Sequence, residues 1–218
     1  MSFINSHFSS QPVTTSVHSN EKWELANDIW KMARLTRTAP SLNIRQAGSL
    51  SYSTNMNFKI EEMQPAHWRQ VCEIYRQGLR TGQATFEVEV PAPEKWDARH
   101  FADARLVATS DTGGIIGWAA LSPVSTRAAY AGVAEVSVYV GERHRGQRVG
   151  QELLKVLVAE SEKMGVWTLQ ASIFPENEAS IKIHRNCGFR EVGRRERIGK
   201  LNGVWRDTVL MERRRAAD

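Results

Sequence analysis

A turn rich in glycine and arginine, placed between an apolar strand and an apolar helix, limits this chain more than any other segment. The strand is expected at Val133 to Val140, the turn is Arg143-His-Arg-Gly-Gln-Arg-Val-Gly150, and the helix continues to Met164. A helix that begins after such a turn presents unpaired backbone N–H groups and a positive dipole end. The segment therefore predicts an anion site, and the lack of a following Gly-Lys-Ser/Thr excludes a Walker A loop.

A second patterned segment begins as Asn177-Glu-Ala-Ser-Ile-Lys-Ile-His184 and ends as Asn186-Cys-Gly-Phe189. Asn177 has the side chain of a helix N-cap. Gly188 suits a left-handed C-terminal cap, after which Phe189 begins the next strand. Turn and cap chemistry explains each of these residues alone, but it explains the two patterned segments together much less well.

The remaining pattern predicts an α/β domain around a mixed sheet. Asp111-Thr-Gly-Gly114 is a strong hairpin turn between two strands. The expected strands are 58–63, 105–109, 115–121, 133–140, 167–174, 189–197 and 204–211. The expected helices are 65–79, 93–101, 150–164 and 178–187.

Composition and charge narrow the class of function. The 218 residues carry a formal net charge of +5, and no apolar run approaches the roughly 18 residues that cross a bilayer. No basic stripe interleaved with aromatics indicates a nucleic-acid partner, so the clustered arginines favour an anionic small molecule. Cys72 and Cys187 are too few for a disulfide framework, and no spacing indicates a metal site. Without a secretory or transit signal, a cytoplasmic location is expected.

Residues 1 to 55 differ from the rest of the chain. They are polar and lack strand patterning, although Glu21 to Leu35 has a weak amphipathic pattern with Trp23 and Trp30 on one face. Such a segment offers little apolar burial to offset its ordering entropy. We expect a disordered, dispensable extension before a domain spanning 56 to 218, with a natural start at Met56 as one hypothesis. The alternative is a short helix that docks through the two tryptophans.

Together the two patterned segments resemble the GNAT acetyltransferase superfamily. Its pyrophosphate motif, Gln/Arg-x-x-Gly-x-Gly/Ala, matches Arg145 to Gly150, with Arg148 in place of the middle glycine. Its later Asn…Ser…Tyr/His…Gly-Phe helix matches Asn177 to Phe189. The resemblance covers Phe58 to Glu212 and implies a mixed, mostly antiparallel sheet flanked by helices, with acetyl-CoA as co-substrate and no metal. The residues implied to bind acetyl-CoA are Val138, Tyr139, Val140, Arg145, Gly146, Gln147, Arg148, Val149, Gly150, Gln151, Asn177 and Ser180.

Finer features are similar to one branch, the phosphinothricin and methionine-sulfoximine N-acetyltransferases. The matching segments are Gln83-Ala-Thr-Phe-Glu87, Arg127-Ala-Ala-Tyr130, Glu135-Val-Ser-Val-Tyr-Val140 and Asn202-Gly-Val-Trp-Arg-Asp207, with Val204 where a larger residue or Arg is usual. The branch implies a small amino-acid-like amine as acceptor and a homodimer. The residues implied to line the acceptor pocket are Thr85, Phe86, Arg127, Ala128, Ala129 and Tyr130. Arg127 and Tyr130 are candidates to grip a carboxylate or phosphinate, or else are solvated loop residues.

The same resemblance makes Glu135 the favoured general base, because an α-amino group is mostly ammonium near neutral pH. Its alternative is an ion-paired strand residue. The backbone N–H of Val138 is expected to stabilise the thioester oxyanion, and amides near Val140 are expected to hold the pantetheine arm like an added strand. His184 stands where many relatives carry a Tyr general acid, and an acid role and a structural role remain equally open.

Two other functions remain open from the sequence. Acetylation of a peptide or protein N-terminus needs an open groove instead of the aromatic pocket that Phe86, Tyr130 and Trp205 suggest. A non-catalytic acetyl-CoA sensor would use residues 1 to 55 as a partner-binding arm, but it would not need a base such as Glu135. Cys187 is interpreted as a packing residue, since direct transfer needs no nucleophile on the enzyme.

Overall fold

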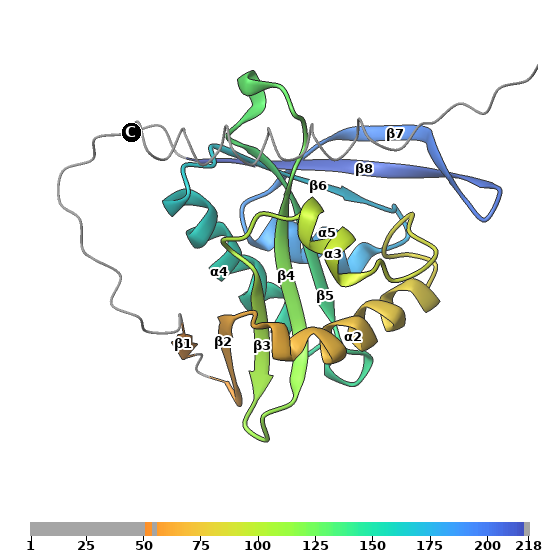
Figure 1. The fold of residues 1–218 in the computed structure, drawn as a ribbon. Coiled ribbons are helices and arrows are strands. Elements are labelled where there is room, and N and C mark those ends of the chain that lie inside the picture. Colours follow the sequence, from red (N-terminus) through yellow and green to blue (C-terminus); the bar gives the residue numbers. More distant parts are fainter. Residues whose placement is uncertain (1–50, 54–55, 216–218) are drawn as a thin grey trace, which may run out of the picture.

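An eight-stranded sheet forms the centre of the computed structural model, which describes residues 51–53 and 56–215 (Figure 1). The strand order is β1-β2-β3-β4-β5-β6-β8-β7, and every neighbouring pair is antiparallel except β5 and β6. The strands are β1 Ser51–Ser53, β2 Phe58–Glu62, β3 Leu106–Ser110, β4 Ile115–Pro123, β5 Val133–Val140, β6 Thr168–Ile173, β7 Arg190–Leu201 and β8 Val204–Arg214. The expected mixed, mostly antiparallel α/β fold is confirmed. The helical pattern expected at 21–35 lies outside the described residues.

The described α-helices match the four expected ones with small shifts at their ends, and the 3₁₀ turns η2 (Ala128–Tyr130) and η3 (Glu142–His144) were not expected. The remaining helices are η1 Pro65–His67, α2 Trp68–Arg80, α3 Pro93–Arg99, α4 Val149–Lys163 and α5 Glu178–Asn186. Pro65 begins a 3₁₀ turn instead of an α-helix, because the His67 N–H bonds the Gln64 carbonyl (2.9 Å) three residues back.

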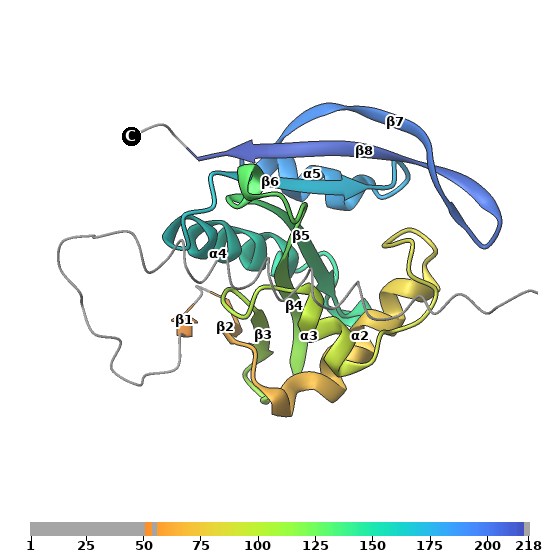
Figure 2. The ribbon, with the colours of Figure 1, turned by 45° about the horizontal axis from the view of Figure 1, so that its top comes forward.

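The helices cover both faces of the sheet and divide the core into two parts (Figure 2). On one face α4 and α5 pack on the sheet, and Leu157 and Leu169 are buried there. On the other face α2 and α3 cover the sheet with aromatic side chains. The rings of Tyr75 and Trp96 meet Trp118 edge-on, with centroids 5.5 and 5.9 Å from it.

The two parallel strands separate soon after they meet. β5 pairs with β6 over Val133 to Glu135 only, whereas β4 stays paired with β5 as far as Val140. From Val136 to Val140, one edge of β5 therefore has no strand partner among the described residues. The divergence opens a cleft between β5 and β6, and the site described below lies there.

The first strand lies inside the segment expected to be a disordered extension. β1 pairs antiparallel with β2, and Tyr52 packs against the core. The Tyr52 hydroxyl donates to the Glu160 carboxylate, and the Lys163 ammonium donates to both groups (3.0 and 2.6 Å). Glu160 is only 6% exposed, and a buried carboxylate without partners is costly. The ordered fold thus begins at least five residues before Met56.

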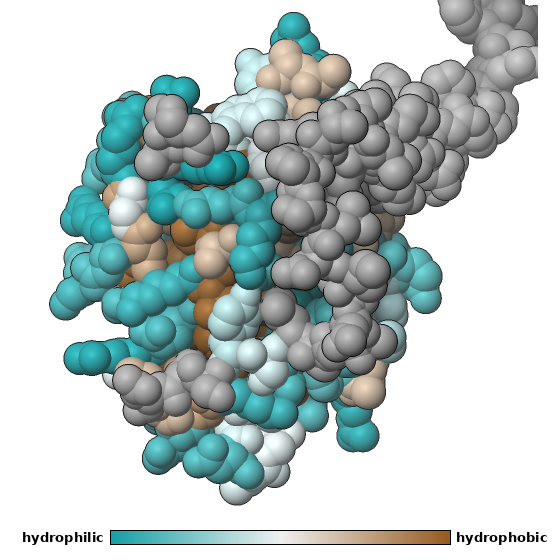
Figure 3. All heavy atoms as spheres, turned by 90° about the vertical axis from the view of Figure 1, so that its left-hand side faces the viewer, coloured by the Kyte–Doolittle hydropathy of each residue, from teal (hydrophilic) through white to brown (hydrophobic). Residues whose placement is uncertain are grey.

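Hydrophilic side chains cover most of the visible surface on the side where β1 and α4 lie, with apolar residues showing in a narrow strip (Figure 3). Within the described part of the chain, no helix is long and apolar enough to cross a membrane.

We predict that a chain starting at Met56 unfolds more easily than one starting at Ser51. Removing β1 takes the Tyr52 hydroxyl from buried Glu160, so we expect a loss of about 1–3 kcal/mol in the free energy of unfolding. Urea denaturation of the two fragments measures the difference, and the Ser51 fragment controls for loss of residues 1–50. Equal stabilities would show that β1 is dispensable.

Candidate active site

The free edge of β5 forms the floor of the cleft. The Gly141 N–H donates to the Ile116 carbonyl on the β4 side (2.9 Å). Because backbone groups alternate along a strand, the N–H and C=O groups of Val138 and Val140 point the other way, into the cleft. Neither residue has a strand partner on that edge among the described residues. An extended ligand can bond to this edge as an added strand does.

A groove of about 660 Å³ leads from this edge to the start of α4. Arg148 has φ +63° and Gly146 has φ +76°, so the turn adopts the left-handed conformation twice. The next residues begin α4 with N–H groups that have no helical partner. A Cβ at Gly150 would lie 3.2 Å from Val140 Cγ2 and 3.3 Å from Ile183 Cδ1, so glycine keeps this end of the groove open.

The groove brings together nearly all the residues predicted to bind the cofactor. Its lining includes Val138, Tyr139, Val140, Arg145, Gly146, Arg148, Val149, Gly150, Gln151, Asn177 and Ser180. Gln147 is the exception, because its side chain turns back and donates to the Arg143 carbonyl (3.0 Å).

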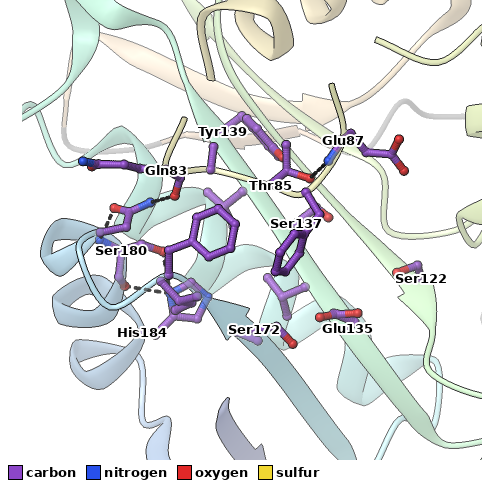
Figure 4. A pocket seen from close by; sticks show the side chains of 18 residues that line it. Gln83, Thr85, Glu87, Ser122, Glu135, Ser137, Tyr139, Ser172, Ser180 and His184 are labelled. Carbon is purple, nitrogen blue, oxygen red and sulfur yellow. Dashed lines mark hydrogen bonds between the residues drawn. The ribbon is translucent and has the colours of Figure 1, made fainter. Parts of the chain in front are cut away.

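A second cavity of about 420 Å³ adjoins the groove, and we call it the acceptor pocket (Figure 4). The predicted residues in its lining are Thr85, Phe86, Glu135, Val138, Tyr139, Asn177, Ser180 and His184. Six residues line both cavities: Gln83, Ala84, Val138, Tyr139, Asn177 and Ser180. The two cavities therefore share a wall, and on β5 they meet at Val138 and Tyr139, beyond the point where β5 leaves β6.

Glu135 lies at the last paired position of β5, opposite Gln170, and lines the acceptor pocket. Its carboxylate makes no ion pair or side-chain hydrogen bond with the described residues. The alternative interpretation of Glu135, an ion-paired strand residue, therefore has no support among the described residues. No described side chain competes for its carboxylate.

His184 lines the same pocket, and its ring is hydrogen-bonded to the backbone of its own helix. Its Nδ1 lies 2.8 Å from the Ser180 carbonyl oxygen, and since a carbonyl can only accept, Nδ1 carries the proton. The other nitrogen, Nε2, is buried without a hydrogen-bond partner among the described residues. Burial lowers the pKa of His184 below its ordinary value, against the opposing effect of the Ser180 bond. The lowered pKa favours the neutral ring at pH 7, and in that form Nε2 must gain a proton before it can donate one.

The loop that closes the pocket is tied to the β7–β8 hairpin and to α5. Phe86 meets Phe174 edge-on with centroids 4.8 Å apart, and a Cβ at Gly199 would lie 2.9 Å from the Phe86 ring. Arg206 lies over the Phe174 ring at 4.3 Å and donates to the Gly82 carbonyl (3.0 Å). These contacts hold the aromatic wall of the pocket in place.

The structure does not bring the predicted segment 127–130 into the acceptor pocket. Arg127, Ala128, Ala129 and Tyr130 are exposed in η2, within the green loop at the top of Figure 1. The Arg127 guanidinium lies 5.9 Å from the centroid of the Tyr130 ring, so the two side chains contact each other. Their role in binding the acceptor stays a prediction.

Several lining residues were missed. Glu87 stands in a segment that resembles the branch, but it was not assigned to the site. Ser137 likewise stands in the matching segment Glu135 to Val140 without having been assigned, whereas Ser122 and Ser172 belong to strands and carry no motif that marks them. In the described part of the chain, no group of three or more His, Cys, Asp or Glu side chains is placed to hold a metal ion.

A model of the acetyltransferase (GNAT) family matches residues 68–189, more than half of the chain. The chain belongs to the GNAT acetyltransferase family. It is 38% identical to a phosphinothricin N-acetyltransferase of Alcaligenes faecalis over 150 residues, which cover 66% of this chain and 75% of that protein. It is 33% identical to the L-methionine sulfoximine/L-methionine sulfone acetyltransferase of Pseudomonas aeruginosa over 107 residues, 49% of this chain and 62% of that one.

Solved GNAT structures agree with this fold and with the predicted cofactor. A phosphinothricin acetyltransferase of Sinorhizobium meliloti in complex with AcCoA is 31% identical, with a TM-score of 0.67 over 73% of this chain and 89% of that one. The yncA protein of Salmonella typhimurium with acetyl-CoA is 25% identical, with a TM-score of 0.68 over 75% and 98%. The predicted family and enzyme class, a GNAT N-acetyltransferase, are confirmed.

We predict that His184 of this GNAT enzyme is a neutral imidazole with its proton on Nδ1 at pH 7. Nitrogen chemical shifts of labelled protein, assigned with a His184→Asn variant, measure the protonation of each ring nitrogen. Because burial opposes the charged form, the ring should titrate only below its ordinary pKa of about 6.5. A proton on Nε2 at pH 7 would contradict this prediction and would support His184 as the general acid.

Proposed function

We propose that this protein transfers the acetyl group of acetyl-CoA to the amino group of a small amino-acid-like acceptor, with Glu135 as general base. One observation carries the proposal. Glu135 presents in the acceptor pocket a carboxylate that no described residue pairs with, on the same strand as Val138 and Tyr139, which border both the pocket and the groove. The named activities of the relatives support an acceptor of the phosphinothricin, methionine sulfoximine or methionine sulfone type.

The groove fits the acetyl donor by its shape and its chemistry. The turn at Arg145 to Arg148 and the free N–H groups at the start of α4 would hold the pyrophosphate. The Val138 and Val140 backbone groups would hold the pantetheine arm along the free edge of β5. When bound, acetyl-CoA supplies a thioester carbonyl, whose oxygen the Val138 N–H would polarise.

The acceptor arrives as an ammonium ion and must lose a proton before it attacks. Glu135 would accept that proton directly or through a water molecule. His184 with a bare Nε2 is not set up to protonate the leaving thiolate. A thiol with a pKa of about 8.5 leaves without such help, so His184 would serve to shape the pocket and fix α5.

We predict that Glu135→Gln lowers turnover about 10²–10⁴-fold at neutral pH, because the amide cannot take the proton. The affinity for acetyl-CoA should change little, since the groove is intact. Turnover is measured by thiol release. The acceptors compared are phosphinothricin, methionine sulfoximine, methionine sulfone and peptide amines, and the fastest of them identifies the acceptor class. Near-normal turnover in the variant would remove Glu135 from the mechanism.

We also propose a homodimer, as the resemblance implies. The β7–β8 hairpin exposes Ile198 (51%), Val204 (63%) and Trp205 (53%), which a second copy would cover. Light scattering of the purified protein measures this, and a monomer at all concentrations would contradict it.

A further inference from the structure

The acceptor pocket has two carboxylates and no lysine or arginine in its lining. The carboxylates are Glu87, which Arg99 neutralises (2.9 Å), and Glu135, which no described residue neutralises. A like charge beside Glu135 is unfavourable unless a cation compensates it. An acceptor that carries an anionic group therefore needs a positive charge from just beyond the lining.

Within residues 51–53 and 56–215, three arginines contact residues of that lining, and two of them already have carboxylate partners. Arg99 pairs with Glu87, and Arg206, which lies over Phe174, pairs with Glu176 (3.1 Å). Arg195 differs, because it contacts the lining residue Ser172 and forms no ion pair within the described ranges. Its charge is available to a ligand.

Arg195 reaches the pocket by crossing a strand. It lies opposite Thr208 of β8, to whose hydroxyl oxygen its Nε donates (3.1 Å), while its Nη2 donates to Ser172 Oγ on β6 (2.7 Å). Strands lie about 4.8 Å apart, so the half-buried side chain spans β8 to arrive at β6. The Nη1 group has no partner among the described residues.

Ser172 connects this cation to Glu135. Glu135 is paired with Gln170, and Ser172 is two residues further along β6, on the same face of the sheet. Both residues line the pocket and are labelled along its lower side in Figure 4. Ser172 therefore lies one strand spacing, about 4.8 Å, across from Glu135 and two residues, about 6.6 Å, further along, which places the two backbones at least about 8 Å apart.

We propose that Arg195 and Ser172 form the subsite for the α-carboxylate of the acceptor. The Ser172 hydroxyl and the free guanidinium N–H groups are the donors that a carboxylate accepts from, and the arginine adds charge. In an α-amino acid the amine and the carboxylate share one carbon atom, so one molecule with a hydrogen bond of about 3 Å at each end can span the gap between Glu135 and Ser172. This inference rests on the proposed function and deepens it.

The subsite gives the enzyme a preference for free amino acids over peptides. A free amino acid carries the α-carboxylate, whereas the first residue of a peptide has a neutral amide there. Removing the carboxylate would leave the Arg195 charge uncompensated in a half-buried place, which penalises the neutral analogue. The exposed Arg127 is not needed for this discrimination.

The test compares methionine sulfone with its carboxamide as acceptors, with acetyl-CoA as donor. In the unaltered protein the acid should have the lower KM. In Arg195→Ala we expect the KM for the acid to rise about 10- to 100-fold, the range for a charged hydrogen bond, with kcat nearly kept. The KM for the carboxamide should change little, which also shows that the variant is folded. Arg195→Lys should recover only part of the loss, since a lysine lacks the planar fork.

Arg194→Ala is the matched control. It removes the same charge from the neighbouring position of β7, where Arg194 pairs with Asp207 (2.7 Å), and it should leave the preference for the acid unchanged. An equal loss for the acid and the carboxamide in Arg195→Ala would assign Arg195 a structural role and overturn the inference, as would an unchanged KM. If the unaltered protein acetylates neither compound nor any other small amine, the proposed function itself fails and this subsite fails with it.

Discussion

The short parallel pairing of β5 with β6 is the constraint on which the rest of the site depends. After three residue pairs the strands part, and the backbone of β5 keeps N–H and C=O groups that no strand satisfies within the described chain. Backbone groups of this kind need a partner when they leave water. Glu135 lies where the two strands separate, and the buried His184 of α5 lines the same cleft.

Electrostatics differ between the two ends of the cleft. The donor end combines the first turn of α4 with Arg145 and Arg148, so it attracts anions. The acceptor end has carboxylates in its lining, and its arginines stand one layer back. In the proposed reaction this distribution would suit a zwitterion, whose ammonium group would meet Glu135 and whose carboxylate would meet Arg195. Arg206 lies over Phe174, in the aromatic wall at this end of the cleft.

The sequence predicted the parts of the site that depend on residues adjacent in the chain. The glycine turn and the cap at Asn177, whose side chain accepts from the Ser180 N–H (3.2 Å), follow from a few adjacent residues, and both were placed correctly in the chain. Ser172 and Arg195 meet only because β8 lies between β6 and β7, and the alternation of apolar residues does not specify that order. β1 was missed because three residues, Ser-Tyr-Ser, are too few to show a strand pattern. What ties this strand to the fold is the hydrogen bond from the Tyr52 hydroxyl to Glu160, 108 positions away in the sequence.

The wall shared by the two cavities has a consequence for the order of events in the proposed reaction. Gln83, Asn177 and Tyr139 border both cavities, and Cys187 lies outside both linings, with its thiol near the Gln151 carbonyl (3.7 Å). In the proposed direct transfer the amine attacks the thioester itself, and no acetylated enzyme is formed. Donor and acceptor would then have to occupy the two cavities at the same time before either is consumed.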